Sequence, residues 1–270
     1  MRDDHGQPDA RGVVGVGGHG RLGHLGGRLR DVGRLVLPVE CPGCGLWDVV
    51  LCAACAGVLD APVDRFEQHV PRLDRMDGTA PLPVWAVAPY TGPVRGVVVA
   101  WKDRGRADLG RHLLRTAARM GAEVAPDVRA ALGTQTLHVV PVPSAPGARR
   151  RRGADLVRGL AGAVADGLAS QGVSARLAPV LVQRRGGRDQ VGLGARARGR
   201  NTTDRIRLRT GPVRRPAPAG RWHLLVDDVV TTGSTLAAAG EVLSRNGGFV
   251  LAAVVLAATP PPARPPVGFS

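Results

Sequence analysis

Aromatic residues are scarce in this sequence and account for 3% of its 270 residues. A protein that stacks single-stranded bases on aromatic side chains needs more of them, so any nucleic-acid contact is expected to go to phosphates. No segment reaches the ~18 consecutive apolar residues of a membrane span. The N-terminus also lacks the apolar core of a signal peptide, and these absences predict a soluble, cytoplasmic protein.

Lysine is nearly absent, and Lys102 is the only one. Arginine supplies the other positive charges, and the formal net charge is +15. One interpretation is a compositional bias of the whole chain. The other is an anionic partner such as a nucleic acid, nucleotide or phosphosugar. The distribution of charge favours the second, since seventeen arginines but four aspartates, and no Glu or Lys, lie between Ala145 and Arg215.

The two ends of the chain show no pattern of a folded element. Residues 1–37 are rich in Gly, Arg and His and residues 259–270 in proline, so both are predicted to be disordered tails. Gly15, Gly17 and Gly20 match a dinucleotide-binding pattern. That interpretation is rejected, because no long strand precedes these glycines and the segment after them is not helical.

Short apolar runs alternate with amphipathic stretches between residues 80 and 258, which predicts an α/β domain with a parallel sheet covered by helices on both faces. Residues 184–215 are rich in arginine and poor in apolar residues, and are predicted to form a long mobile loop. The predicted strands are 84–90, 136–143, 177–183, 222–229 and 249–259, and the predicted helices are 93–105, 107–124, 154–172 and 234–248.

All four cysteines lie within fifteen residues, as C-x2-C-x7-C-x2-C, at Cys41, Cys44, Cys52 and Cys55. Two such knuckles can surround one Zn²⁺ tetrahedrally, and a site filled by four thiolates is structural rather than catalytic. Two disulfides or one redox pair are the alternatives, but nothing indicates an oxidising compartment and a redox pair does not need the second knuckle. We therefore predict a zinc knuckle over residues 38–62.

The stretch "HLLVDDVVTTGST" places two carboxylates, Asp227 and Asp228, at the predicted end of an apolar strand. A loop of small residues and a helix N-terminus follow, and together they expose N–H and hydroxyl donors that suit a phosphate. The carboxylates would repel that phosphate but can accept hydrogen bonds from the hydroxyls of an attached sugar. A plain capped helix behind a strand-end aspartate is the alternative.

This stretch resembles the signature of type I phosphoribosyltransferases. The resemblance implies that fold, with Asp227 and Asp228 engaging the ribose of phosphoribosyl pyrophosphate as the catalytic pair, and Mg²⁺ carried by the substrate. It implies a 5-phosphate site in the following loop and a pyrophosphate-binding turn after residues 136–143. These substrate-binding residues are Thr231, Thr232, Gly233, Ser234 and Thr235 in the loop, and Val142, Pro143 and Ser144 in the turn.

The combination with an N-terminal four-cysteine knuckle resembles the ComF/GntX family, which is linked with competence and DNA uptake. The segments "CPGCG…LCAAC", "YTGPVRGVVVAWKDRGRADLG", "VPVPSAPGARRRRGADLVRGLA" and "RGGRDQVGLGARARGRN" carry this resemblance over roughly residues 38–258. It adds Lys102 and Arg152 to the substrate-binding residues, and Gln190, Arg198 and Asn201 in the flexible loop. Ala154-Asp155-Leu156 stand where the family usually has Phe-Asn-Gln, and the usual aromatic residue after Asn201 is missing.

Three functions follow from these patterns. The first is a phosphoribosyltransferase with an unknown nitrogen acceptor, as in nucleotide salvage. The second is a non-catalytic protein of DNA uptake that binds single-stranded DNA and partners a DNA-uptake helicase. The third is a regulator that senses the phosphosugar without turnover.

Overall fold

The computed structural model describes residues 39–70, 73, 81–143, 155–183, 205–209 and 219–260. Residues Met1–Val39 and Glu40–Ser270 form separate units, and the elements below belong to the second. The predicted tails, apart from Thr259 and Pro260, lie outside the described residues, as does most of the predicted basic loop. No helix in the described ranges is long and apolar enough to cross a membrane.

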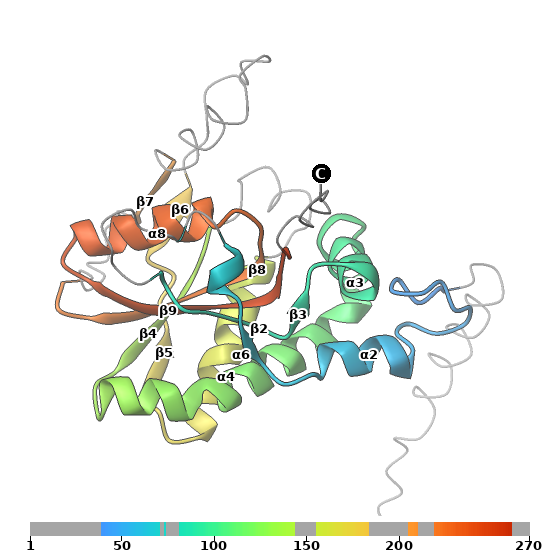
Figure 1. Cartoon of the computed structure of the whole chain (residues 1–270), viewed down its shortest axis with the longest axis horizontal. Helices are drawn as coiled ribbons and strands as arrows, with labels where there is room; N and C mark the ends of the chain where they lie inside the picture. Colours follow the sequence, from blue (N-terminus) through green and yellow to red (C-terminus); the bar gives the residue numbers. More distant parts are fainter. Residues whose placement is uncertain are drawn as a thin grey trace, which may run out of the picture. The chain divides into compact units, whose positions relative to one another are not determined.

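A seven-stranded, mainly parallel sheet forms the centre of the second unit (Figure 1). Its strand order is β1-β2-β9-β8-β4-β5, with β3 also paired to β9, and among its described strands only β1 and β2 pair antiparallel. The α/β prediction with a mainly parallel sheet is confirmed. The strands are β1 (Asp64–Arg65), β2 (Val84–Ala86), β3 (Ala88–Pro89), β4 (Leu137–Pro141), β5 (Ala175–Leu177), β8 (Trp222–Val230) and β9 (Phe249–Ala258).

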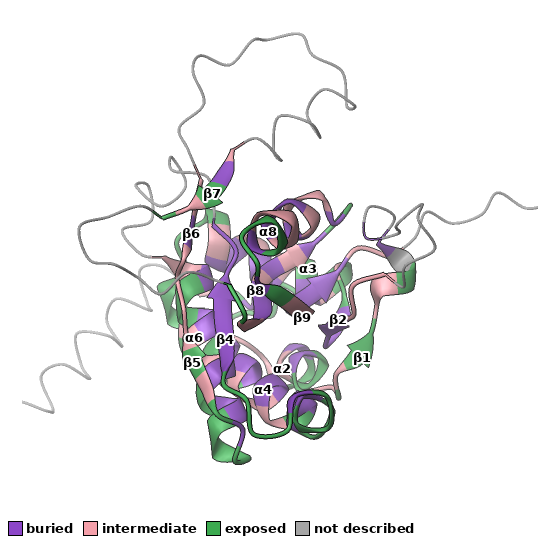
Figure 2. Cartoon of the chain, turned by 90° about the vertical axis from the view of Figure 1, so that its left-hand side faces the viewer, coloured by how far each residue is buried: buried purple, intermediate pink, exposed green. Residues whose placement is uncertain are grey.

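Helices cover both faces of this sheet. The apolar residues of α3 (Gly92–Asp103), α4 (Gly110–Leu132) and α6 (Leu156–Ser170) join one buried cluster with one side of the strands. Those of α8 (Ser234–Arg245) join a second cluster with the other side, and α8 lies across the sheet from α4 (Figure 2). Both clusters contain alternate residues of β8, as a strand buried on two faces requires.

The sequence pattern accounts for these helices. In α4, Leu113, Ala117, Met120 and Val124 recur at the three- and four-residue spacing of one helical face, and all four are buried. In α6, the side chain of Asp155 accepts a hydrogen bond from the N–H of Arg158 and so caps the first turn. Pro126 lies inside α4 without ending it.

The predicted strand 177–183 is wrong as one element, because Pro179 interrupts it. β5 ends at Leu177 and pairs with β4, whereas β6 (Leu181–Gln183) leaves the main sheet and pairs antiparallel with β7 (Ile206–Leu208). β7 lies inside the stretch predicted to be a mobile loop. Its Ile206 is buried against the α8 side of the sheet, and that packing stabilises a strand among arginines.

Candidate functional site

The strand order reverses between β4 and β8. The chain leaves β4 toward β5 on one side and leaves β8 toward β9 on the other, so the two carboxyl ends adjoin at a topological switch point. Open parallel sheets bind their ligands outside such a point. The last pair of this ladder joins Pro141 to Val226, and the Val142 N–H donates to the Val226 carbonyl at 2.8 Å.

The acidic pair follows directly after that last pair. β8 continues past them to Val230, one residue beyond the predicted strand 222–229, because Val229 and Val230 pair with Ala257 and Ala258 of β9. Asp227 and Asp228 therefore stand where β4 has ended and β9 still supports the backbone. Successive residues of a strand point to opposite faces, so the two carboxylates leave β8 on different sides.

Asp228 forms an ion pair with Lys102 of α3. The Lys102 ammonium donates to Asp228 Oδ1 at 2.7 Å and lies 2.6 Å from Oδ2. The Asp228 side chain is 3% exposed and that of Lys102 is 32% exposed, so the carboxylate is buried while the ammonium reaches it from the surface. Asp228 Oδ1 also accepts from the Val229 N–H at 2.8 Å.

Asp227 is half-buried, and its Oδ1 accepts from the Asp228 N–H at 2.8 Å. Burial raises the pKa of Asp227 well above its usual 3.8, the charge of Asp228 raises it further, and Lys102 partly offsets both. The two neighbouring carboxyls therefore resist carrying two negative charges at once. A ligand that brings a cation or hydroxyl donors to Asp227 relieves that repulsion.

The loop Thr231–Thr235 joins β8 to the N-terminus of α8. Thr231 and Thr232 are exposed, and Ser234 and Thr235 are half-buried in the first turn of the helix. The Thr232 hydroxyl donates to the Ser234 hydroxyl at 3.2 Å, which gathers both groups at the helix start. First-turn N–H groups have no acceptor within their own helix, so this loop presents the donors that a phosphate requires.

Gly233 is required here for two reasons. Its φ of +79° is left-handed, and a Cβ at this position would lie 2.4 Å from Val70 Cγ1 and 3.0 Å from Leu73 Cγ. Val70 and Leu73 follow the short helix η1 (Glu67–His69) and are buried on the α8 side. This contact has no signal in the sequence, because residues 66–73 show no strand or helix periodicity.

The four cysteine sulfurs lie within 4.8 Å of one another, with 3.6 Å between those of Cys44 and Cys52. Zinc bonds of ~2.3 Å in a tetrahedron require sulfurs ~3.8 Å apart, so the donor set and spacing fit a tetrathiolate metal ion. Burial opposes ionisation of Cys41, but N–H groups of Cys52, Gly43 and Cys44 outweigh it and lower its pKa to about 6. Burial and the neighbouring thiols raise the pKa of Cys55.

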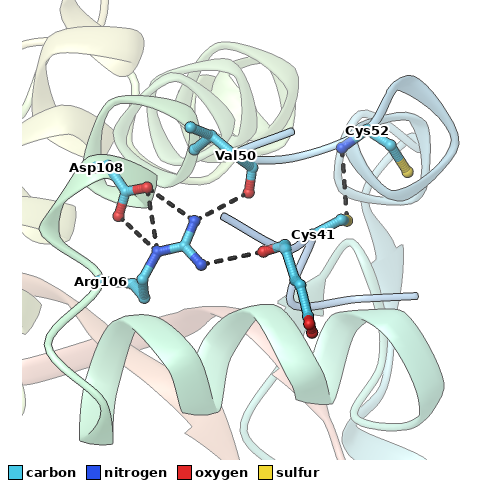
Figure 3. A network of polar contacts seen from close by, with 6 residues as sticks. Cys41, Val50, Cys52, Arg106 and Asp108 are labelled. Carbon is cyan, nitrogen blue, oxygen red and sulfur yellow. Dashed lines mark hydrogen bonds and ion pairs between the residues drawn. The ribbon is translucent and has the colours of Figure 1, made fainter. Parts of the chain in front are cut away.

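Arg106 joins the cysteine region to the α/β domain (Figure 3). Its guanidinium donates to the carbonyls of Glu40 at 3.1 Å and Val50 at 3.3 Å, and to the carboxylate of Asp108 at 2.8–3.1 Å. Glu40 adjoins Cys41, and Val50 lies two residues before Cys52. The short helix α2 (Ala53–Leu59) then carries Cys55.

The structure thus brings together the acidic pair, the loop after it and Lys102. Val142 and Pro143 lie next to them at the end of β4, but both side chains are buried, so only their backbone groups can face a ligand. The remaining predicted residues, Ser144, Arg152, Gln190, Arg198 and Asn201, lie outside the described residues.

Comparison with known proteins found no matching family model and no matching curated protein. Among solved structures, the chain is similar to hypoxanthine phosphoribosyltransferase from Trypanosoma cruzi in a ternary substrate complex, at 17% identity and a TM-score of 0.36, over 58% of this chain and 73% of that one. It is also similar to hypoxanthine-guanine phosphoribosyltransferase from L. donovani, at 19% identity and a TM-score of 0.36, over 54% and 67% of the two chains.

Proposed function

We propose that this chain binds phosphoribosyl pyrophosphate with Mg²⁺ and is a phosphoribosyltransferase of the type I fold. The observation that carries the proposal is the position of Asp227 and Asp228 beside the Thr231–Thr235 loop, at the switch point of the sheet. The N–H and hydroxyl groups of the loop hold the 5-phosphate. The carboxylates accept from the ribose hydroxyls, and the terminal groups of β4 lie next to the pyrophosphate.

The proposed reaction is a substitution at the ribose C1 carbon. The bond from C1 to the pyrophosphate oxygen breaks and pyrophosphate keeps the electron pair, while a nitrogen nucleophile forms the new bond and then loses its proton. Negative charge near C1 stabilises the oxocarbenium-like state, and Mg²⁺ carried by the substrate supplies charge to the leaving group. Asp227 and Asp228 are the residues of this chain that would act on the ribose.

Calorimetric titration with Mg²⁺–phosphoribosyl pyrophosphate tests this proposal. The wild-type chain is expected to bind it more tightly than ribose 5-phosphate or pyrophosphate, because each of these fills only part of the site. Asp228→Asn is expected to weaken binding at least ~10-fold, the loss of one charge-assisted hydrogen bond. Asp166→Asn, on the exposed face of α6, is the matched control and should bind like wild type. No binding by wild type would overturn the proposal.

The resemblance to the ComF/GntX family supports a second candidate, a role in DNA uptake through single-stranded DNA binding. Its support in the residues is the arginine excess between Ala145 and Arg215. The knuckle itself is an unfavourable surface for phosphates, because residues 40–62 contain Glu40, Asp48 and Asp60 and no basic residue. Because the arginines would contact the phosphates, oligonucleotide affinity should fall steeply with salt and survive Asp228→Asn. Salt-independent or absent binding would reject this role.

A further inference from the structure

Helix α3 contacts the cysteine region along its N-terminal half. A Cβ at Gly96 would lie 2.1 Å from the carbonyl oxygen of Pro42, and one at Gly43 would lie 2.6 Å from Cys55 Sγ and 3.1 Å from Pro93 Cβ. The backbone between Cys41 and Cys44 therefore rests directly on α3. No other residue type permits these two approaches without displacing backbone or a cysteine sulfur.

Arg106 fixes the segment that follows the C-terminal end of the same helix. Its guanidinium spans the carbonyls of Glu40 and Val50 and is held in plane by the Asp108 carboxylate (Figure 3). The Glu40 carbonyl belongs to the segment that carries Cys41 and Cys44, and the Val50 carbonyl to the segment that carries Cys52 and Cys55. These two cysteine-bearing segments are called limbs below. The arginine is thus anchored to the cysteine region by both limbs.

Lys102 lies between these two attachments. Gly96 precedes it by six residues and Arg106 follows it by four, and its ammonium reaches Asp228 on the central strand β8. Six helical residues span ~9 Å, so a shift of α3 at Gly96 is carried to Lys102 through continuous helix. Asp228 cannot follow such a shift, because Val226, Asp227 and Val229 beside it are paired with neighbouring strands.

We propose that the cysteine cluster positions Lys102 against Asp228 through α3 and Arg106, so that metal at the cysteines and phosphosugar at the acidic pair favour each other's binding. Lys102 and Arg106 are positioning residues in this account. The coupling to phosphosugar rests on the proposed function, whereas the positioning of Lys102 does not.

The physical basis is the repulsion among four thiolates. A bound cation removes it and closes the two limbs into one geometry, in which Glu40, Val50 and Pro42 present their carbonyls to Arg106 and α3. When the limbs separate, Arg106 loses two of its acceptors and α3 loses the support at Gly96. The ion pair with Asp228 then loosens, and the charge balance of the acidic pair changes with it.

The scarcity of lysine supplies a direct test. Labelling the full-length chain with ¹⁵N-lysine gives one side-chain ammonium resonance, that of Lys102. We expect removal of zinc under reducing conditions to move this resonance toward that of Asp228→Asn, which lacks the ion pair between Lys102 and Asp228. Arg106→Gln, which loses the planar fork and adds no second lysine, should move it the same way with zinc present. Arg104→Gln, which removes the same charge at an exposed site two residues away, should leave it unchanged.

The second arm measures the coupling itself. Zinc-loaded protein should bind Mg²⁺–phosphoribosyl pyrophosphate about tenfold more tightly than zinc-free protein, and the phosphosugar should raise zinc affinity by the same factor. A Lys102 resonance that ignores zinc would overturn the whole proposal. A resonance that moves, in a protein that binds no phosphosugar even with zinc, would support the positioning role and overturn the coupling together with the proposed function. Phosphosugar affinity that is high but independent of zinc would overturn the coupling alone.

Discussion

Lys102 and Asp228 are 126 positions apart in the sequence, yet the ammonium of one donates to the carboxylate of the other at 2.7 Å. The pair joins a surface helix to the central strand of the sheet. The only lysine of the chain therefore lies against Asp228, one of the two carboxylates that we propose to bind the ribose. The site therefore holds a positive charge against its acidic pair.

Removing this lysine is expected to destabilise the fold. Lys102→Met leaves the Asp228 carboxylate buried without its cation, and we expect the free energy of unfolding in urea to fall by about 1–3 kcal/mol. The double variant Lys102→Met/Asp228→Asn should recover much of that loss, because the uncompensated charge is gone. A double variant no more stable than Lys102→Met alone would show that the pair is not what stabilises this position.

The left-handed turn before α8 gives a second prediction. Gly233→Ala should cost about 1–2 kcal/mol for its backbone conformation and more for the overlap with Val70. Gly172→Ala is the matched control, since Gly172 has nearly the same φ of +78° and open space where the Cβ would lie. The melting temperature of Gly233→Ala should lie below that of Gly172→Ala. Adding Val70→Ala to Gly233→Ala should recover part of this difference. Equal losses for the two glycine variants would contradict the contact.

A buried histidine pair predicts the pH dependence of stability. His138 and His223 are neighbours on β4 and β8, with ring centroids 5.6 Å apart. Burial lowers the pKa of His138 from 6.5 to about 4, helped by the charges of Arg176, His223 and Arg221, and burial also lowers that of His223. Both rings are thus neutral when folded and take up protons on unfolding.

The contribution of the two neutral histidine rings to the free energy of unfolding is complete above pH 6.5. It is lost as the pH falls from 6.5 toward 4. For His138 the loss is on the order of 3 kcal/mol. Urea unfolding between pH 7.5 and 4.5 measures it, and His138→Leu should flatten the slope. His112→Gln, on α4, serves as the control and should keep it. An unchanged slope in His138→Leu would refute this assignment.

Metal removal provides a fourth prediction. Chelation of zinc from the reduced protein should abolish hydrogen-exchange protection over residues 40–55, because this region is too small for a core of its own. Peptides from α4 and β9 should stay protected, since their apolar residues belong to the main core. Cys44→Ser should reproduce the effect of chelation. Protein that contains no zinc after expression in zinc-supplemented medium would contradict the assignment.

The sequence predicted the α/β class and the order of strand, small-residue loop and helix around Thr231–Thr235, because both depend on local patterns. It ended this strand at Val229, whereas Val230 remains in β8 through its pairing with β9. It missed β7, whose strand depends on burying Ile206 within an arginine-rich segment. The ion pair of Lys102 and the packing of Val70 on Gly233 join distant segments, and no local pattern contains such information.

The central claim is most directly tested by a crystal structure of the chain with Mg²⁺–phosphoribosyl pyrophosphate. We predict the 5-phosphate against the N–H and hydroxyl groups of Thr231–Thr235 and the ribose hydroxyls on Asp227 and Asp228. A phosphosugar bound away from this loop, or bound with its ribose out of reach of both carboxylates, would contradict the account.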